Sequence, residues 1–353
     1  MEELLKLNRE YIIDYEQLWD SMMKCQCGVR WKPSVKQFVI NAPTDILKMH
    51  DQLSDNTWKN GKPREIKIMY PKKRDGLSIS FRDRVYQRSI NDNALYPEMT
   101  KHFIFDNCAC QKGKGTSFAR RRMKQHLWRH YCKYGSEGYI LQIDIHGYYP
   151  NMKHEEVKKY FKKYLDPEVY KMVCDVLDNQ YVGDIGYNPG SQMVQIAGIS
   201  LLNPIDHYIK EVLHVKGYLR YMDDFSLIHI SKDFLSNCLV LIKEKLEFIG
   251  FELNEKKTMI KSLKKGFTFL GFNYRITDTG KVIMTLNSDN IKHERKKLYR
   301  LVQKCKRGEV ERDKVDECYT SWKSFANEGN SFKLLQRMDS YYNSLWRCNY
   351  ESN

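Results

Sequence analysis

The sequence lacks both a long apolar run and the features of a secretory leader. No apolar stretch reaches the roughly 20 residues that a membrane-spanning helix requires. The start, Met-Glu-Glu-Leu-Leu-Lys, has neither the basic first segment nor the apolar core of a signal peptide. The chain also contains no internal repeat and no low-complexity linker. We therefore expect no membrane partner, a cytoplasmic location, and one compact unit with subdomains.

Acidic side chains are in the minority. The 353 residues include 59 Lys and Arg but 44 Asp and Glu, which gives a net charge of +15. A basic excess favours a polyanionic partner such as nucleic acid, although charge alone leaves an ordinary soluble basic protein open. Hydrophobic residues make up 42% of the chain, enough for one or two packed cores. The composition thus predicts a globular protein.

The ten cysteines lack the spacing of a usual zinc site. Cys25-x-Cys27 and Cys108-x-Cys110 are shorter than Cys-x₂-Cys, and no neighbouring His pair completes either of them. Other cysteines, such as Cys238, fall within periodic apolar patterns. We interpret the cysteines as reduced, buried small hydrophobes, with zinc as the alternative at the two pairs.

Two adjacent carboxylates, Asp223 and Asp224, stand between runs rich in β-forming residues. The runs at 217–221 and 225–230 predict two strands joined in a tight hairpin. An isolated acidic pair is usually a turn or a solvated loop. Buried carboxylates, however, repel each other unless a cation or hydrogen bonds neutralise them, and Mg²⁺ prefers oxygen ligands of this kind.

A third carboxylate changes the interpretation of this pair. Asp144 ends the apolar run at 138–143 and is soon followed by Tyr148 and Tyr149. Two strands that end in Asp side by side can hold two divalent ions about 3.5–4 Å apart. Such ions activate the attacking oxygen and stabilise the leaving oxygen in phosphoryl transfer.

At these residues the sequence resembles the reverse transcriptases of the bacterial retroelement type. Their palm carries Asp-x-x-x-aromatic-aromatic, matched by Asp144 to Tyr149, and Tyr-x-Asp-Asp, matched by Tyr221 to Asp224. The resemblance implies that Asp144, Asp223 and Asp224 are catalytic. It also implies that they hold two Mg²⁺ ions together with Ile145, and that Mn²⁺ can substitute. Tyr149 matches the aromatic gate, whose ring would clash with a ribose 2′-hydroxyl.

A basic hairpin is expected before these motifs. Strands around 66–70 and 77–81 flank Lys72, Lys73 and Arg74 at the tip, where a triphosphate could be clamped. A solvated hairpin tip is the plain alternative. By the resemblance Lys72 and Arg74 contact the incoming nucleotide.

Two further motifs resemble the fingers of group II intron and diversity-generating retroelement enzymes. They are the segment that begins a helix at 81–88, with Arg82 and Arg84, and the loop at 112–115, with Lys112 and Lys114. In those enzymes the motifs guide the template strand. Physically, the two glycines of the loop let backbone amides and ammonium groups approach phosphates closely.

The helix expected at 117–134 combines basic and aromatic side chains. Its basic members are Arg120, Arg121, Arg122, Lys124, Arg129 and Lys133. Aromatic rings between such charges favour contact with nucleic acid, with Arg121 among the contacts, and a solvated basic face is the alternative.

The stretch at 188–195 leads into a helix expected at 196–214. Gly190 and Gln195 match nucleotide-contacting positions of the diversity-generating enzymes, whereas Val194 replaces a serine. A simple loop-to-helix turn is the alternative, and Val194 leaves fidelity open. Further on, 251–258 resembles the last palm motif, which places Lys257 near a phosphate.

These motifs predict an α+β fold of the right-hand polymerase type. We expect an N-terminal extension at 1–65, fingers and palm with an antiparallel sheet and helices at 66–284, and a helical thumb at 285–353. The extension should contain a helix at 2–23 and a region broken by prolines 33, 43 and 63; the thumb should contain helices at 288–307, 315–326 and 332–346. We expect no ribonuclease H, endonuclease or integrase segment.

The expected function is RNA-directed DNA polymerisation from dNTPs. We expect the chain to copy an associated non-coding RNA template into a DNA product in antiphage defence, because compact reverse transcriptases without nuclease domains occur there. A diversity-generating enzyme is one alternative, and a catalytically inactive RNA-binding protein with the same fold is another. An accessory protein or a second copy of the chain is a candidate partner.

Overall fold

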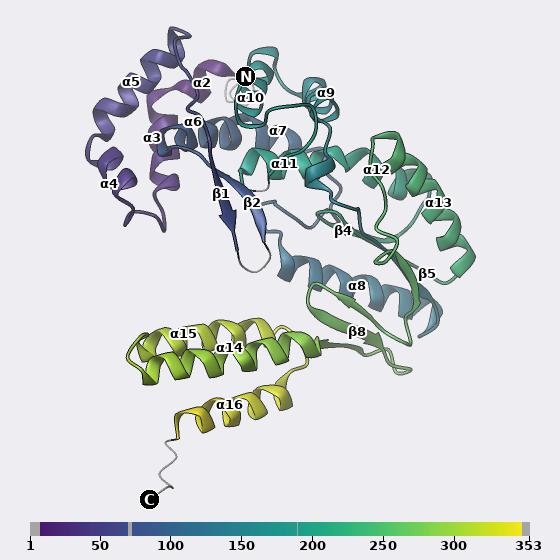
Figure 1. Cartoon of the computed structure of the whole chain (residues 1–353). Helices are drawn as coiled ribbons and strands as arrows, with labels where there is room; N and C mark the ends of the chain where they lie inside the picture. The colour runs from purple at the N-terminus through teal and green to yellow at the C-terminus, as the bar shows by residue number, and fades with distance from the viewer. Residues whose placement is uncertain (1–7, 70–72, 189, 348–353) are drawn as a thin grey trace, which may run out of the picture.

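The computed structural model describes residues 8–69, 73–188 and 190–347, and it combines helices with three antiparallel sheets (Figure 1). The sheets have the strand orders β1-β2, β4-β5-β3-β6 and β7-β8-β9. The predicted α+β class is therefore confirmed. No helix in these described ranges is both long enough and apolar enough to cross a membrane.

The N-terminal region is helical, but its helices differ from the prediction. Asp14 interrupts the expected helix at 2–23, because its carboxylate accepts a hydrogen bond from the Glu16 amide at 2.9 Å and starts a new helix. Pro33 and Pro43 do not break the chain; each lies in the first turn of a helix, where a missing N–H costs nothing. The helices are α2 (Arg9–Ile13), α3 (Tyr15–Cys25), α4 (Pro33–Ile40) and α5 (Ala42–Ser54).

A hairpin and a long helical segment follow. A hairpin is present, with strands β1 (Arg64–Ile68) and β2 (Arg74–Ser78), and it extends from the N-terminal helices toward the C-terminal ones (Figure 1). Both strands begin earlier than predicted, so Arg74 lies in β2, paired with Ile68, and not at the tip. The Ser80 hydroxyl caps the next helix by accepting from the Asp83 amide at 3.1 Å. The helices are α6 (Phe81–Ile90), the π-helix η1 (Asn91–Leu95), α7 (Tyr96–Thr100) and α8 (Thr116–Tyr134).

The central sheet carries the acidic motifs. Its strands are β4 (Gly217–Tyr221), β5 (Asp224–His229), β3 (Tyr139–Ile143) and β6 (Met259–Ser262). Alternation along the strands divides its side chains between two cores. Leu141, Phe225 and Leu227 pack with the N-terminal elements, whereas Ile140 and Ile228 pack with α8 and the third sheet.

Helices connect and cover this sheet. They are the 3₁₀-helix η2 (Tyr149–Asn151), α9 (His154–Tyr164), α10 (Pro167–Gln180), α11 (Gln192–Leu201), α12 (Asn203–His207), the π-helix η3 (Tyr208–Val212) and α13 (Lys232–Phe248). The single helix predicted at 196–214 is wrong in its bounds. The helical segment begins at Gln192 and is divided near Pro204, which lacks an amide hydrogen and lies in the first turn of α12.

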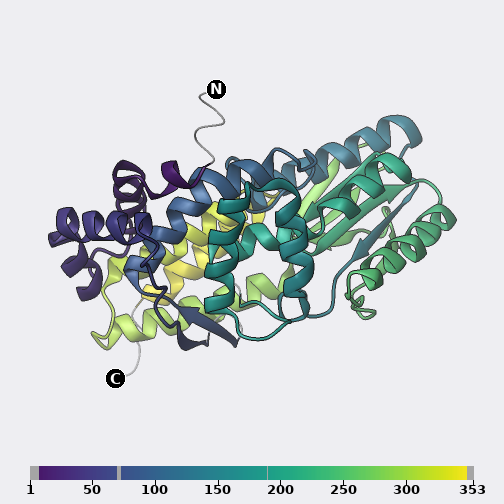
Figure 2. The same cartoon turned by 90° about the horizontal axis from the view of Figure 1, so that it is seen from above.

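The C-terminal part forms a separate layer. Its elements are β7 (Phe267–Phe269), β8 (Phe272–Ile276), β9 (Val282–Leu286), α14 (Ser288–Lys306), α15 (Arg312–Ala326) and α16 (Phe332–Trp346). The three helices agree closely with the predicted ranges. They lie below the other helices in Figure 1 and run beneath them in the view from above (Figure 2).

A buried arginine joins this layer to α8. The Arg120 guanidinium donates to both carboxylate oxygens of Glu328, at 2.7 and 2.9 Å. It also lies 5.2 Å from the rings of Phe272 and Phe325, which adds cation–π attraction. Arg120 therefore anchors the C-terminal layer and is not available to a phosphate.

Candidate active site

The hairpin formed by β4 and β5 ends in an acidic turn, which lies at one end of the central sheet. Tyr221 pairs with Asp224, so Met222 and Asp223 form a two-residue turn. Met222 has φ of +55°, a left-handed conformation that a bulky non-glycine residue adopts at a cost. On the neighbouring strand, Ile143 pairs with Phe225, so Asp144 follows directly opposite Asp224. The structure thus brings the three predicted aspartates together.

The three carboxylates disfavour one another's charge. Burial raises the pKa of Asp224 to about 7, and the charges of Asp223 and Asp144 add to this increase. Burial also raises the pKa of Asp223, again with help from Asp144. A cation placed among them would reverse both effects, since positive charge favours the ionised carboxylates.

Asp144 already has a cationic partner. The Lys257 ammonium donates to both of its carboxylate oxygens at 3.1 and 2.9 Å, and the Asn254 amide side chain donates to one of them at 2.9 Å. The Asn254 backbone N–H also donates to the Asp144 carbonyl at 2.8 Å. Lys257, which we expected near a phosphate, instead holds an aspartate in this structure. Its side chain is 61% exposed, so it can swing away.

The carboxylate oxygens of the site suit divalent ions only after Lys257 moves away from Asp144. Within the described ranges, no group of three or more His, Cys, Asp or Glu side chains is arranged to hold a metal ion as it stands. Mg²⁺ usually takes one or two carboxylates and completes its shell with water and substrate phosphate. Asp144 and Asp223 fit that pattern once Lys257 leaves. Ile145, the expected backbone ligand, is buried and forms an isolated bridge with Leu253.

Tyr149 packs closely against a glycine. A Cβ atom on Gly198 of α11 would lie 3.1 Å from the Tyr149 hydroxyl, so a larger residue there would push the ring by a few tenths of an ångström. The Tyr148 ring packs against Tyr149 edge to face, with centroids 5.5 Å apart. The Tyr149 hydroxyl is buried without a hydrogen-bond partner in the structure, and burial raises its pKa. The Tyr149 hydroxyl therefore makes no hydrogen bond to the residues that the structure describes.

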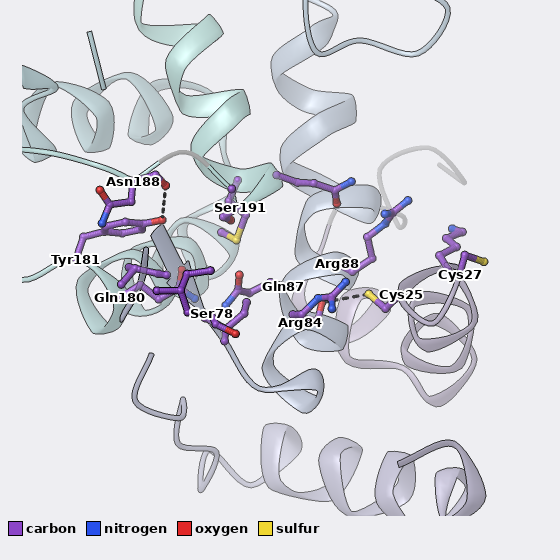
Figure 3. Close-up of a pocket in the computed structure, with 17 residues that line it drawn as sticks. Cys25, Cys27, Ser78, Arg84, Gln87, Arg88, Gln180, Tyr181, Asn188 and Ser191 are labelled. Carbon is purple, nitrogen blue, oxygen red and sulfur yellow. Dashed lines mark hydrogen bonds between the residues drawn. The ribbon is translucent and has the colours of Figure 1, made fainter. Parts of the chain in front are cut away.

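A pocket of about 490 Å³ lies between α3, the base of the β1-β2 hairpin, α6 and the start of α11 (Figure 3). Arg84 and Gly190, both predicted to contact nucleotides or nucleic acid, line it. So does Gln87, which is 5% exposed and whose side-chain Nε2 has no hydrogen-bond partner among the residues that the structure describes. Because an unpaired buried donor is costly, Gln87 favours a ligand with an acceptor in this pocket.

The other residues predicted to contact nucleotide or template near the β1-β2 hairpin do not all lie at this pocket. Lys72 lies outside the described residues, and of Arg74 only the backbone, in β2, is described. Arg82 stacks on the Trp58 ring at 4.1 Å and donates to a backbone carbonyl. Gln195 is half-buried in α11 and does not line the pocket of Arg84.

The basic loop before α8 is partly engaged with the protein itself. The Lys112 side chain is exposed and lies 5.4 Å from the Tyr96 ring. The Lys114 ammonium, in contrast, donates to the carbonyls of Phe105 and Asn107 at 3.0 and 3.1 Å, and burial lowers its pKa. Lys114 therefore stabilises the loop, and Lys112 is the freer of the two.

The helix α8 does not present all its basic residues to one surface. Arg121 is exposed, as a nucleic-acid contact requires. Arg120 and Arg122 are buried instead, and Arg122 donates to the Asp106 carboxylate at 2.7 Å. The basic run therefore does not form one exposed surface, because Arg120 and Arg122 lie on the face of α8 that packs inside.

One charged pair at the site was not predicted from the sequence. Arg220 of β4 and Asp206 of α12 are both fully buried and joined at 2.6 Å. The available signal was a charged residue inside an apolar strand, next to the acidic turn.

The sequence matches a known protein family. The sequence model of the family described as reverse transcriptase (RNA-dependent DNA polymerase) matches residues 71–274, more than half of the chain. Similar solved structures include telomerase from Candida albicans with a fragment of telomeric RNA (14% identity, 83% of this chain and 56% of that chain, TM-score 0.49). Another is apo telomerase from Candida tropicalis (15% identity, 65% of this chain and 55% of that chain, TM-score 0.48).

The chain spans little more than half the length of those two telomerase chains. No curated protein matches the sequence. The family match covers the β4-β5 hairpin, the three aspartates and Lys257. On that match, the chain belongs to the reverse transcriptase family of RNA-dependent DNA polymerases.

Proposed function

We propose that this chain copies RNA into DNA with Asp144, Asp223 and Asp224 as its catalytic residues. The observation that carries the proposal is the strand register that brings these carboxylates to one end of the central sheet. Burial and the charges of Asp223 and Asp144 raise the pKa of Asp224 to about 7, so a cation bound beside it would favour its ionised form. When bound there, two Mg²⁺ or Mn²⁺ ions supply charge that activates the primer hydroxyl and stabilises the leaving pyrophosphate.

The remaining residues bind and orient the substrates. Asp144 and Asp223 hold the ions with the backbone of Ile145, and Asp224 supports them from the neighbouring strand. Lys257 releases Asp144 when ions bind and meets the triphosphate, which its exposed side chain allows. Tyr149 excludes the ribose 2′-hydroxyl by its bulk, since Gly198 lets its ring pack closely.

The template and the incoming nucleotide approach from the hairpin side. We assign nucleotide contacts to Lys72, Arg74, Gly190 and Gln195, together with Tyr149. The template contacts are Arg82, Arg84, Lys112, Lys114 and Arg121. The pocket lined by Arg84, Gln87 and Gly190 supports this assignment, because it offers a cation and an unpaired amide donor to a nucleotide.

In this proposal the chain has three parts. Residues 1–65 form an extension, 66–284 form fingers and palm, and 285–353 form the thumb. The family match at 71–274 falls within the second part. The third part contains three helices after residue 287, as a helical thumb requires.

The proposed biological role is antiphage defence through copying of a non-coding RNA encoded nearby. The net charge of +15 supports binding to such an RNA through its phosphates. A diversity-generating retroelement is the alternative role. A variable-protein gene with a template repeat beside the coding gene would favour that alternative.

The test of the polymerase proposal is primer extension on an RNA template with Mg²⁺. We expect labelled DNA from the wild-type protein and none from Asp223→Asn, with RNA binding by the variant unchanged. Asp233→Asn, at an acidic position remote from the turn, is the matched control and should extend normally. DNA synthesis by Asp223→Asn would refute the assignment. Absence of synthesis by the wild type on every primer, template and metal would favour the inactive RNA-binding protein.

A further inference from the structure

The Arg220 guanidinium makes more hydrogen bonds than those that pair its charge with Asp206. Its guanidinium donates twice to the Asp206 carboxylate, from Nε to Oδ1 at 2.7 Å and from Nη2 to Oδ2 at 2.6 Å. The Tyr218 hydroxyl also donates to Asp206, at 2.6 Å. Arg220 and Asp206 are both 0% exposed. The bidentate pair satisfies the two charges and leaves further donors free.

The remaining donors reach two backbone carbonyls. Nη2 donates to the Ile199 carbonyl of α11 at 3.0 Å, and Nη1 donates to the Met222 carbonyl at 2.7 Å. Met222 is the left-handed residue of the turn, and its carbonyl belongs to the peptide bond that enters Asp223. One guanidinium therefore joins α11, α12 and the backbone that carries a catalytic carboxylate.

The turn is supported from a second side. The Arg220 backbone N–H donates to the Asp106 carbonyl at 3.0 Å, and its own carbonyl accepts from the Cys108 N–H at 2.9 Å. The Cys110 thiol contacts the Met222 sulfur at 3.4 Å. The segment before the basic loop thus runs along β4 and fixes the strand from which the guanidinium extends.

We infer that Arg220 is a positioning residue for the polymerase reaction, which holds the Met222–Asp223 peptide in its left-handed conformation so that Asp223 meets the metal ions. A left-handed conformation is strained for a non-glycine residue and persists only when its surroundings impose it. The partly buried hydrogen bond from the Arg220 guanidinium to the Met222 carbonyl imposes it here. This inference rests on the proposed role of Asp223.

A purely structural ion pair is the competing explanation, and a double variant separates the two. Replacing a buried pair by apolar residues of similar volume is often neutral for stability. Arg220→Met/Asp206→Leu removes both charges and also the contact to the turn. Tyr218→Phe is the matched control, because it removes one hydrogen bond to Asp206 and leaves the Met222 carbonyl bonded.

We expect the double variant to melt near the wild-type temperature and to lose about 100-fold in kcat, since small misplacement of a catalytic group has effects of that size. The KM for dNTP should change much less than kcat. Without metal or substrate, the backbone amides of residues 222–224 should exchange with deuterium faster, while those of β3 stay protected. Tyr218→Phe should leave kcat and exchange near wild type.

If the double variant does not fold, Arg220→Lys provides the same test. Lysine keeps a cation beside Asp206 but cannot bond the carboxylate and the Met222 carbonyl together. A variant with wild-type kcat and unchanged exchange at 222–224 would overturn the inference. The exchange measurement needs no DNA synthesis, so it still tests Arg220 if the polymerase proposal itself fails.

Discussion

Two ion pairs lie at the acidic turn and the neighbouring Asp144, and they differ in exposure. Arg220 and Asp206 are both inaccessible to solvent and share two hydrogen bonds. Lys257 and Asp144 are also doubly bonded, but the lysine side chain is 61% exposed. Buried charges cannot separate without leaving one of them unpaired in the core, whereas an exposed ammonium is readily hydrated.

The difference separates a fixed part of the site from a releasable one. The turn with Asp223 is bonded to a guanidinium that has no route to solvent. Asp144 is paired with the Lys257 ammonium, which water can hydrate when the pair separates. We expect the turn to keep its shape through a catalytic cycle, and Lys257 to exchange places with the incoming ions.

The largest expected effect on stability comes from breaking the buried pair. Asp206→Leu leaves the Arg220 guanidinium uncompensated in the core, which should lower the free energy of unfolding by about 3–5 kcal/mol. Denaturant melts would measure it. Adding Arg220→Met to Asp206→Leu should restore most of the loss. If the single variant is as stable as wild type, the pair is not the fixed part of the site.

The next effect concerns pH. Burial and the charges of Asp223 and Asp144 raise the pKa of Asp224 from 3.8 to about 7, so the folded protein retains a proton that the unfolded chain releases. Stability therefore falls as pH rises between those two values and is level above them. In buffer that contains a metal chelator, the melting temperature should fall more steeply between pH 4.5 and pH 7.5 for the wild type than for Asp224→Asn. Parallel curves would contradict the raised pKa.

A smaller effect is expected at the sugar gate. Tyr149→Ala should increase ribonucleotide relative to deoxyribonucleotide incorporation by about tenfold or more, as the loss of steric exclusion allows. Tyr149→Phe is the matched control and should keep the wild-type preference, because the hydroxyl has no partner in the structure. Gly198→Ala should shift the preference less, by pushing the ring a few tenths of an ångström. An unchanged ratio in Tyr149→Ala would assign sugar selection elsewhere.

The sequence predicted the parts of this site that depend on local patterns. The hairpin around Asp223 and the strand before Asp144 follow from alternating β-forming runs, and the end of α14 follows from Gly308. The site residues themselves remain proposals. The sequence could not predict which basic residues are already paired, because their partners lie far along the chain. Arg120 meets Glu328 and Lys257 meets Asp144 across 208 and 113 positions.

The smallest expected effect belongs to the exposed pair. Lys257→Met should change the free energy of unfolding by less than about 1 kcal/mol, since solvent screens an exposed ammonium. Lys256→Met, at the exposed neighbouring position, is the matched control. Without Lys257, Asp144 loses its cation, so Mn²⁺ should bind more tightly than in either the wild type or the control, as measured by electron paramagnetic resonance without substrate. A loss of stability as large as that of Asp206→Leu would show that Lys257 belongs to the fixed part. Equal Mn²⁺ affinity in all three proteins would show that the ammonium does not compete with the ions for Asp144.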